Sequence, residues 1–377
     1  MGRTVTDLQM PSISAAEARE GGFQVVDVRS PGEFGEGHMP GAVNRPLFDD
    51  RQREAVGLAY RREGAPRARL AAMELVSPGL AEYLGSLAGL ARSQPRGRRL
   101  AIMCWRGGER SRNVALLLAL IGVHAVTVTG GYRAYRREVL AGLEQWQPPV
   151  PVLTLYGKTG AGKSALLRAL AEIAPGVRGP RPRPLDLEEL ALHRGSLLGG
   201  LNQPGERRPK DFDALLWDEL RHPRGDYLVL EGEGGKIGNI FLPRSVANAI
   251  RGGLPVHVSA PLERRAERIM REYAPDTWDE ADVERFRSGL RVIGGRLPRK
   301  TMLSLETALD DGRLTDVVGG LLVDYYDPLY QRSCVEGRHF VLEFATSPDP
   351  LQDARRFVRD AARLIREVSP GPHAGNR

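Results

Sequence analysis

Residues 157–164 constrain the fold of this 377-residue chain more than any other segment. Their sequence, GKTGAGKS, has the spacing G-x4-G-K-S and lies between the apolar run 152–156 and the helix-forming run SALLRALAEI. A glycine-rich turn between a buried strand and a helix directs backbone N–H groups toward an anion. We therefore expect a phosphate-binding loop in which the Ser164 hydroxyl could also bind Mg²⁺. The expected phosphate contacts come from Gly157, Gly160, Gly162, Lys163 and Ser164.

A second strand with a terminal acid usually accompanies such a loop, because a carboxylate there helps to hold Mg²⁺. Residues 227–230 (YLVL) are a predicted core strand, and Glu231 and Glu233 follow it. These glutamates are candidate metal-binding acids, or they neutralise nearby arginines. Since no base-recognition motif is present, the sequence leaves open whether a nucleotide is a ligand.

A second glycine-rich segment, residues 103–111 (MCWRGGERS), joins a predicted strand at 100–103 to a predicted helix at 111–121. The helix N-terminus, Arg106 and Arg110 would stabilise a thiolate on Cys104. The pattern predicts a reactive, exposed nucleophile in an anion-binding cradle. The alternative is an inert cysteine buried behind the strand.

The prolines of residues 147–151 (QPPVP) end a helical pattern and mark the predicted domain boundary. We expect one domain at 10–147 and a second at 152–368, with 1–9 and 369–377 flexible. Short apolar strands alternate with helices on both sides, which is typical of the α/β class. The other expected elements are strands at 23–28, 124–128 and 256–259 and a terminal helix at 350–368.

Composition excludes several classes of protein. The two cysteines, Cys104 and Cys334, are too few for a disulfide scaffold or a cysteine zinc site. No run is long and apolar enough for a membrane span, and no secretory signal is visible, so we expect a cytoplasmic protein without membrane contact. The chain has 49 arginines, five lysines and a net charge of +7, so single arginine clusters are weak evidence for RNA binding. Two of the five lysines lie within residues 157–164, where a compact ammonium suits phosphate.

Residues 27–34 (DVRSPGEF) and 37–44 (GHMPGAVN) resemble the two signature segments of rhodanese domains, and 128–135 (VTGGYRAY) resembles their closing motif. The resemblance implies that Cys104 carries sulfur or selenium in a persulfide-type intermediate. Ordinary rhodanese loops have the spacing C-x4-R, whereas Cys104 and Arg110 have C-x5-R. The longer loop resembles the phosphatase-type variant and implies a wider cradle.

Together with further segments, the two loops resemble the family of bacterial tRNA 2-selenouridine synthases over residues 10–365. The resemblance implies an N-terminal rhodanese-like domain and a C-terminal parallel-sheet domain of the P-loop NTPase type. The segments are 46–50 (PLFDD), 54–60 (EAVGLAY), 186–196 (DLEELALHRGS), 231–238 (EGEGGKIG) and 324–330 (DYYDPLY).

The family resemblance also implies an activity. Selenium from selenophosphate replaces the sulfur of wobble 2-thiouridine in tRNA, through an S-geranylated intermediate made from geranyl diphosphate. Cys104 would then carry selenium, Arg106 and Arg110 would hold its anionic form, and the phosphate loop would hold the geranyl diphosphate. A selenophosphate-supplying enzyme is an expected partner, no tightly bound cofactor is expected, and any metal other than Mg²⁺ is unknown.

Several residues admit two interpretations. Trp105 either stacks on the wobble base or packs beneath the loop, whereas Asp27 and Arg29 are expected to form a structural ion pair. His193 and Arg194 either contact phosphate or RNA or lie in a solvated turn. Cys334, which lacks a basic cradle, is expected to be inert.

Two other functions compete with the one implied by the family. One is a rhodanese-type sulfurtransferase or phosphatase fused to an ATP-dependent small-molecule or RNA kinase, which predicts nucleotide turnover without tRNA. The other is a nucleotide-gated RNA-binding regulator, in which Cys104 would be dispensable.

Overall fold

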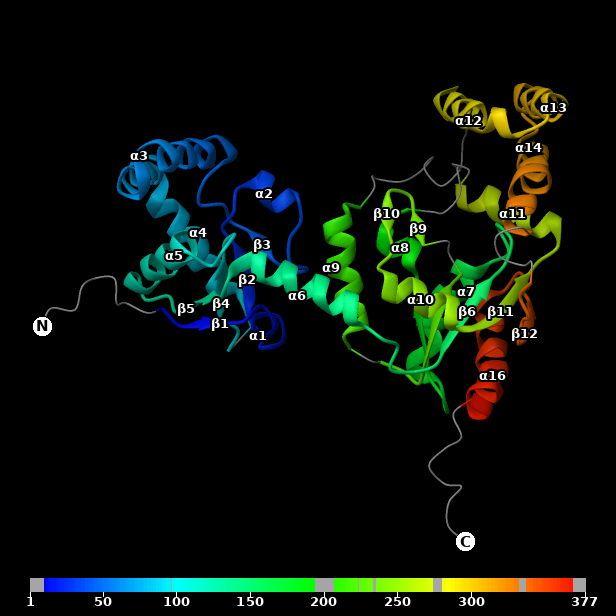
Figure 1. Ribbon diagram of the computed structural model, residues 1–377, viewed down its shortest axis with the longest axis horizontal. Helices are drawn as coiled ribbons and strands as arrows, with labels where there is room; N and C mark the ends of the chain where they lie inside the picture. The colour runs from blue at the N-terminus through cyan, green and yellow to red at the C-terminus, as the bar shows by residue number, and fades with distance from the viewer. Residues whose placement is uncertain are drawn as a thin grey trace, which may run out of the picture. The chain divides into compact units, whose positions relative to one another are not determined.

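The computed structural model describes residues 10–95, 97–193, 207–222, 224–232, 235–273, 280–331 and 337–368. The chain separates into two compact units (Figure 1). The first unit comprises Met1–Gly142 together with Lys210–Asp218, and the second comprises Leu143–Pro209 together with Glu219–Arg377. The domain ranges 10–147 and 152–368 stay predictions, and no sequence pattern indicated that residues 210–218 group with the first unit.

The first unit contains a five-stranded sheet in which every neighbouring pair is parallel. Each strand is short and rich in valine, isoleucine or leucine where it is buried, as expected for a sheet with both faces covered. In spatial order the strands are β1 (Ser12–Ile13), β5 (Ala125–Val128), β4 (Leu100–Met103), β2 (Gln24–Asp27) and β3 (Val43–Asn44).

Helices cover both faces of this sheet (Figure 1). Val26 and Ile102 pack with leucines of α4 and α5 in one core cluster, and alternate residues such as Val25 point to the opposite face. The helices are α1 (Ala15–Glu20), α2 (Pro31–Gly35), α3 (Asp50–Val76), α4 (Leu80–Ser93), α5 (Glu109–Leu120) and α6 (Gly131–Gln145), with a 3-10 turn at Ser77–Gly79.

Most of helix α9 (Pro209–Leu220) belongs to the first unit, although the helix follows the phosphate loop in sequence. The Oδ2 atom of Asp213 lies 2.6 Å from Nη2 of Arg136, and the Nζ atom of Lys210 lies 3.2 Å from a carboxylate oxygen of Glu36. A side chain at Gly142 would collide with the Trp217 ring, because a Cβ there would lie 2.5 Å from the indole. Residues 210–218 therefore complete the packing of the first unit.

The second unit contains a five-stranded sheet that is also parallel throughout. The strand that leads into the phosphate loop, β6, is central, and all five of its residues are buried. In spatial order the strands are β12 (Leu342–Ala345), β11 (Leu254–Ser259), β6 (Val152–Tyr156), β8 (Tyr227–Glu231) and β7 (Pro182–Leu185). A separate antiparallel pair comprises β9 (Lys236–Ile237) and β10 (Ile240–Phe241).

Two helices, α7 (Lys163–Ile173) and α16 (Pro350–Val368), pack together on one face of the second sheet. Leu153 and Leu155 of β6 point into this core, while the Thr154 hydroxyl points the other way and donates to the Ile250 carbonyl oxygen of α10 (Arg244–Gly252) at 2.9 Å. The alternation follows from the two-residue period of a strand. A short helix α8 (Leu187–Ala191) follows β7, and a 3-10 turn (Ala174–Gly176) follows α7.

The remaining helices form a second apolar cluster of their own, built from residues such as Ile269, Leu309 and Tyr325. We call this cluster and its helices the helical subdomain. It contains α11 (Leu262–Tyr273), α12 (Glu280–Ile293), α13 (Arg299–Asp310), α14 (Leu314–Leu321) and α15 (Asp327–Tyr330), with a 3-10 turn at Gly294–Arg296 and a π-helical turn at Leu322–Tyr326.

The two parallel sheets with connecting helices confirm the α/β prediction. Strand and helix positions agree with the expected ranges to within two residues; the largest differences are at β11, which begins at Leu254, and at α5, which begins at Glu109. No helix within the described ranges has the length and apolarity needed to span a membrane.

Candidate active site

Cys104 follows the last residue of β4 and precedes the N-terminus of α5. The N-cap residue of α5 is Gly108, which has no side chain to satisfy the first N–H groups of the helix. These groups are therefore available to an anion beside the thiol. The predicted position of the cysteine, between a buried strand and a helix N-terminus, is confirmed.

The predicted exposure of Cys104 is wrong, because only 3% of the residue is accessible. Its side chain joins the core cluster with Val114, and its backbone is covered by the Gly130–Gly131 turn. A Cβ at Gly131 would lie 2.1 Å from the Cys104 carbonyl oxygen, and the positive φ of +58° at Gly131 also favours glycine. The close approach of this turn explains the paired glycines in the sequence.

Ser111 is the described hydrogen-bond partner of the thiol. Its Oγ atom lies 3.3 Å from the Cys104 Sγ atom and 3.2 Å from the Gly108 carbonyl oxygen, and the residue is fully buried. A hydroxyl in the first turns of α5 can donate to a thiolate. Sequence reasoning missed this residue, although its place directly after Arg110 was an available signal.

Arg110 lies in the first turn of α5 and forms an ion pair with Glu33, with Nη1 2.7 Å from Oε2. Burial acts to lower the pKa of Arg110, but the hydrogen bond and charge of Glu33 outweigh it and the pKa lies above its ordinary value. A negative charge on Cys104 acts in the same direction. Arg110 is thus a fixed cation near the thiol, already partly neutralised by a carboxylate.

Arg106 does not share this arrangement. Its side chain is exposed, and within the described part of the chain it has no hydrogen bond or ion pair. The structure therefore brings Arg110, but not Arg106, into contact with the surroundings of the thiol.

The expected ion pair between Asp27 and Arg29 is confirmed. The Arg29 Nη2 atom lies 2.7 Å from the Asp27 Oδ2 atom, and both side chains are buried. The Arg29 guanidinium stacks on the Tyr132 ring, 3.9 Å from the ring centroid. The Trp105 ring also lies beside Tyr132, with 5.8 Å between the two ring centroids. This contact favours the interpretation that Trp105 packs beneath the loop.

The phosphate loop has the predicted position between β6 and α7. Lys163 is the first residue of α7, and its Nζ atom donates to the Gly157 carbonyl oxygen at 3.0 Å. Gly162 adopts a φ of +98°, and a Cβ there would lie 2.6 Å from the Arg268 Nη1 atom. The glycine thus serves the backbone turn and the close approach of a guanidinium.

Three residues that sequence reasoning missed also contact this loop. The Nε atom of Arg265 donates to the Thr159 carbonyl oxygen at 2.8 Å, and Nη1 of Arg268 donates to the Gly160 carbonyl oxygen at 2.6 Å. The Asp327 carboxylate lies 2.9 Å from the Lys158 Nζ atom. The signals available were the arginine run 264–271 and the segment 324–330, but neither indicated a contact with the loop.

Glu231 ends β8 and is 1% exposed. It pairs in register with Leu155 of β6, two residues before the loop begins. Asp186 lies at the corresponding end of the next strand and caps α8 by accepting from the Glu189 N–H at 2.9 Å. Burial and the nearby charge of Glu231 raise the pKa of Asp186 to about 6. Asp186 was not among the expected site residues.

The acids suit a magnesium ion only in part. The described residues hold no group of three or more histidine, cysteine or acidic side chains that could bind a metal. Mg²⁺ commonly takes one or two protein oxygens and completes its shell with substrate phosphates and water. Glu231 and the Ser164 hydroxyl are donors of that kind. Glu233, Arg194 and Cys334 lie outside the described residues.

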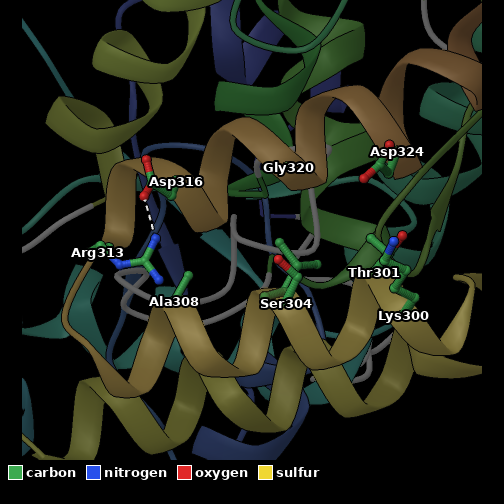
Figure 2. Close-up of a pocket in the computed structure, with 9 residues that line it drawn as sticks. Lys300, Thr301, Ser304, Ala308, Arg313, Asp316, Gly320 and Asp324 are labelled. Atoms are coloured by element: carbon green, nitrogen blue, oxygen red, sulfur yellow. Dashed lines mark hydrogen bonds and ion pairs between the residues drawn. The ribbon is translucent and has the colours of Figure 1, made fainter.

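A pocket of about 290 Å³ lies in the helical subdomain, between α13 and α14 (Figure 2). Lys300 and Arg313 are its cations, but Arg313 is paired with Asp316 at 2.7 Å and with Asp311 at 2.9 Å. With Asp316 and Asp324 also in the lining, the pocket has no excess of positive charge for an anionic substrate. The two glycine-rich loops remain the candidate sites.

Comparison with known proteins identifies the family of the chain. A sequence model described as a rhodanese-like domain matches residues 13–138, and one described as the tRNA 2-selenouridine synthase AAA domain matches residues 150–354. The chain belongs to the tRNA 2-selenouridine synthase family. The two matches also confirm the predicted fold class, a rhodanese-like domain followed by a P-loop domain.

Relatives in the family align over most of their length. A tRNA 2-selenouridine synthase from Cupriavidus pinatubonensis is 33% identical over 336 residues, which cover 82% of this chain and 88% of the relative. One from Cupriavidus necator is 34% identical over 355 residues, or 84% and 90% of the two chains. A solved N-terminal domain of a Clostridium difficile 630 protein, described as ATP/GTP binding, is 35% identical over 34% of this chain and 98% of that domain, with a TM-score of 0.33.

Proposed function

We propose that this chain is a tRNA 2-selenouridine synthase that replaces the sulfur of wobble 2-thiouridine with selenium. The observation that carries the proposal is the presence of two glycine-rich segments at helix N-termini in one chain of this family, one around Cys104 and one at residues 157–164. Relatives that carry this name align with more than four-fifths of the chain. The substrate is accordingly a tRNA with a 2-thiouridine at the wobble position.

We assign the phosphate loop to geranyl diphosphate. In the first step the 2-thio sulfur attacks C1 of the geranyl group, the C–S bond forms, the C–O bond breaks with diphosphate as the leaving group, and N3 of the uracil ring loses its proton. The Lys163 ammonium and the N–H groups at the start of α7 would stabilise the negative charge that develops on the diphosphate. Glu231 and Ser164 would hold a Mg²⁺ ion, which supplies further charge neutralisation when bound.

We assign Cys104 to the transfer of selenium from selenophosphate to the uridine. Its thiolate would attack phosphorus, so that an S–P bond forms and the P–Se bond breaks, and the released hydroselenide would attack C2 while water hydrolyses the S–P bond. Overall, a C2–Se bond forms, the C2–S bond breaks, geranylthiol leaves, and water takes the phosphoryl group of selenophosphate as phosphate. Ser111 can donate to an anionic sulfur or selenium at Cys104, and Arg110 supplies a nearby positive charge. Burial of the thiol would protect a reactive selenium species from water.

The test uses the full chain, a tRNA with wobble 2-thiouridine, geranyl diphosphate and selenophosphate, followed by mass spectrometry of the nucleosides. We expect 2-selenouridine from the wild-type protein and geranylated 2-thiouridine alone from Cys104→Ser. Formation of 2-selenouridine at the normal rate by Cys104→Ser would contradict the role of the thiol.

A second measurement addresses the phosphate loop. Lys163→Ala should weaken the binding of geranyl diphosphate in calorimetry, and an unchanged affinity would remove the loop from the first step. Turnover of ATP or GTP in the absence of tRNA would instead favour a fused kinase.

A further inference from the structure

Asp327 lies between the phosphate loop and the helical subdomain and binds cations from both. Its Oδ2 atom is 2.9 Å from the Lys158 Nζ atom of the loop. The same carboxylate accepts two hydrogen bonds from Arg265 of α11, at 2.9 Å from Nη1 and 2.6 Å from Nη2. One carboxylate therefore neutralises a loop lysine and a buried arginine together.

Arg265 fixes this arrangement, because all three of its side-chain nitrogens are bonded. Its Nε atom donates to the Thr159 carbonyl oxygen of the loop, and its side chain is only 4% exposed. A planar guanidinium held at both ends has little freedom to rotate. The position of Asp327 relative to the loop is thereby determined by a rigid neighbour, whereas Lys158 is 42% exposed and has a flexible side chain.

The backbone around Asp327 is unusual. The π-helical turn Leu322–Tyr326 directly precedes it, and Leu322 and Tyr325 anchor that turn in the same apolar cluster as Ile269 of α11. Such turns are rare in proteins overall, and those that occur are often found at functional sites. The turn also lies beside the pocket of the helical subdomain, where Asp324 is seen at one end (Figure 2). The phosphate loop is thus connected to the helical subdomain through Asp327, which directly follows the π-helical turn.

Asp327 is ionised at neutral pH. Burial acts to raise its pKa, but the hydrogen bonds from Arg265 and Lys158 outweigh burial and leave the pKa below its ordinary value. A negative charge beside the loop opposes the binding of any anion that needs the Lys158 ammonium. A ligand with several negative charges gains more from that ammonium than a singly charged one, because the attraction scales with the charge.

We propose that Asp327 is a specificity-determining residue of the phosphate loop: its carboxylate holds Lys158 until a diphosphate replaces it. A ligand therefore needs enough negative charge to take the ammonium from the carboxylate, and a diphosphate has it. This inference rests on the proposed role of the loop in diphosphate binding. Arg265 stays paired with Asp327 in both states, so the exchange involves only the flexible lysine.

The test is calorimetric titration of the full chain with inorganic pyrophosphate and, separately, with inorganic phosphate. Asp327→Asn keeps the size of the side chain and an oxygen acceptor for Arg265 but removes the charge. We expect pyrophosphate to bind about fivefold or more tightly in this variant, as for the loss of a competing ion pair, and phosphate to gain less because it gains less from the freed ammonium. The preference for pyrophosphate should therefore rise.

Lys158→Met is the matched control, because it removes the ammonium and leaves the Asp327–Arg265 pair intact. In that background Asp327→Asn should no longer alter the preference between the two anions. An unchanged preference in the single Asp327→Asn variant, or the same effect with and without Lys158, would overturn the inference. If the wild-type chain binds no pyrophosphate, the proposed diphosphate-binding role of the loop fails. If pyrophosphate binds but Asp327→Asn leaves the preference unchanged, only the role of Asp327 fails, so the two failures can be distinguished.

A measurement on the wild-type protein covers the case in which Asp327→Asn does not fold. Pyrophosphate should raise the rate of amide hydrogen exchange at residues 322–331, since Lys158 leaves the carboxylate that this segment carries. The same experiment on Lys158→Met should show no such increase. Equal rates of amide hydrogen exchange in the wild-type protein with and without bound pyrophosphate would show that Lys158 does not leave Asp327, which would contradict the proposal.

Discussion

The Sγ atom of Cys104 lies 3.3 Å from the Oγ atom of Ser111, and both residues are buried at the N-terminus of α5. The same hydroxyl lies 3.2 Å from the Gly108 carbonyl oxygen, to which it can donate while the sulfur is a thiol. When the sulfur is ionised, the hydroxyl proton can turn toward it. Ser111 therefore links the charge on the thiol to the first turn of the helix.

Ser111→Ala should slow the reaction of Cys104 with methyl methanethiosulfonate at neutral pH by about tenfold or more. A hydrogen bond to a charged group contributes roughly 1.5–3 kcal/mol, and the thiolate loses it in the variant. The modification is followed at the Cys104 peptide by mass spectrometry. Ser86→Ala, which removes an exposed helical hydroxyl of the same unit, should leave the rate unchanged. Equal rates in both variants would show that Ser111 only packs.

Glu33→Gln should lower the unfolding free energy of the first unit at pH 7 by about 1 kcal/mol, because Arg110 loses its ion-pair partner. Burial acts to raise the pKa of Glu33, but the hydrogen bond and charge of Arg110 lower it by more, so the pKa lies below its ordinary value of 4.5. The stabilisation by the carboxylate is therefore fully present above pH 4.5 and is lost as the pH falls through the lower pKa of the folded state.

Denaturant unfolding at several pH values measures this difference. Glutamine at position 33 can still accept the Ser30 N–H in the capping box of α2, so the comparison reports the charge. Glu17→Gln is the control, since Glu17 has the same capping role in α1 and no arginine partner among the described contacts. A difference between wild type and Glu33→Gln that does not shrink in acid would contradict the ion-pair explanation.

Asp186→Asn should stabilise the second unit above pH 6 and have little effect near pH 4. Burial and Glu231 raise the pKa of Asp186 to about 6, so ionising this group opposes folding. The folded state holds the extra proton between the ordinary value of 3.8 and about 6, and stability falls as the pH rises through that window. Removing the charge should recover up to about 3 kcal/mol.

Calorimetric melting at pH 4 and pH 7.5 tests this prediction. Asparagine is as good an N-cap as aspartate, so α8 keeps its cap in the variant. The control is Asp49→Asn, which makes the same substitution at the exposed N-cap of α3. If Asp186→Asn melts at the same temperature as the wild-type protein at both pH values, the interaction with Glu231 is not significant.

Gly142→Ala should destabilise the first unit by about 1–3 kcal/mol, the usual effect of overpacking. The added methyl group would lie 2.5 Å from the Trp217 ring, which is a rigid neighbour. Gly89→Ala in α4 is the matched control, because nothing lies within 4 Å of a Cβ there and alanine favours a helix by about 1 kcal/mol. Tryptophan fluorescence during denaturation measures both variants. A stabilising Gly142→Ala would mean that residues 210–218 do not pack here.

The architecture could be predicted because each of its signals is local. Buried strands such as 100–103 and 152–156 are continuous apolar runs, and the glycine-rich segment 157–164 indicates both a turn and a helix start. The segments that resemble known families then placed the two loops in one fold class. None of these inferences needed contacts between residues distant in the chain.

The remainder of the site depends on contacts between distant residues. Asp327 and Lys158 are separated by 169 positions, and Glu33 and Arg110 by 77. The burial of Cys104 follows from the approach of the Gly130–Gly131 turn, which no pattern around residue 104 indicates. Arg106 and Arg110 are also alike in sequence, yet only Arg110 meets a carboxylate. Such differences arise in tertiary packing and are not encoded in spacing.

The place of residues 210–218 in the first unit has a consequence for biosynthesis. A ribosome makes the chain from its N-terminus, and domains commonly fold as they emerge. Here the sheet around Cys104 emerges early, but its last packing helix follows only after residues 157–164 have been translated. A truncated nascent chain would therefore hold an unfinished thiol unit, and the thiol unit becomes complete only in molecules that already possess the phosphate loop.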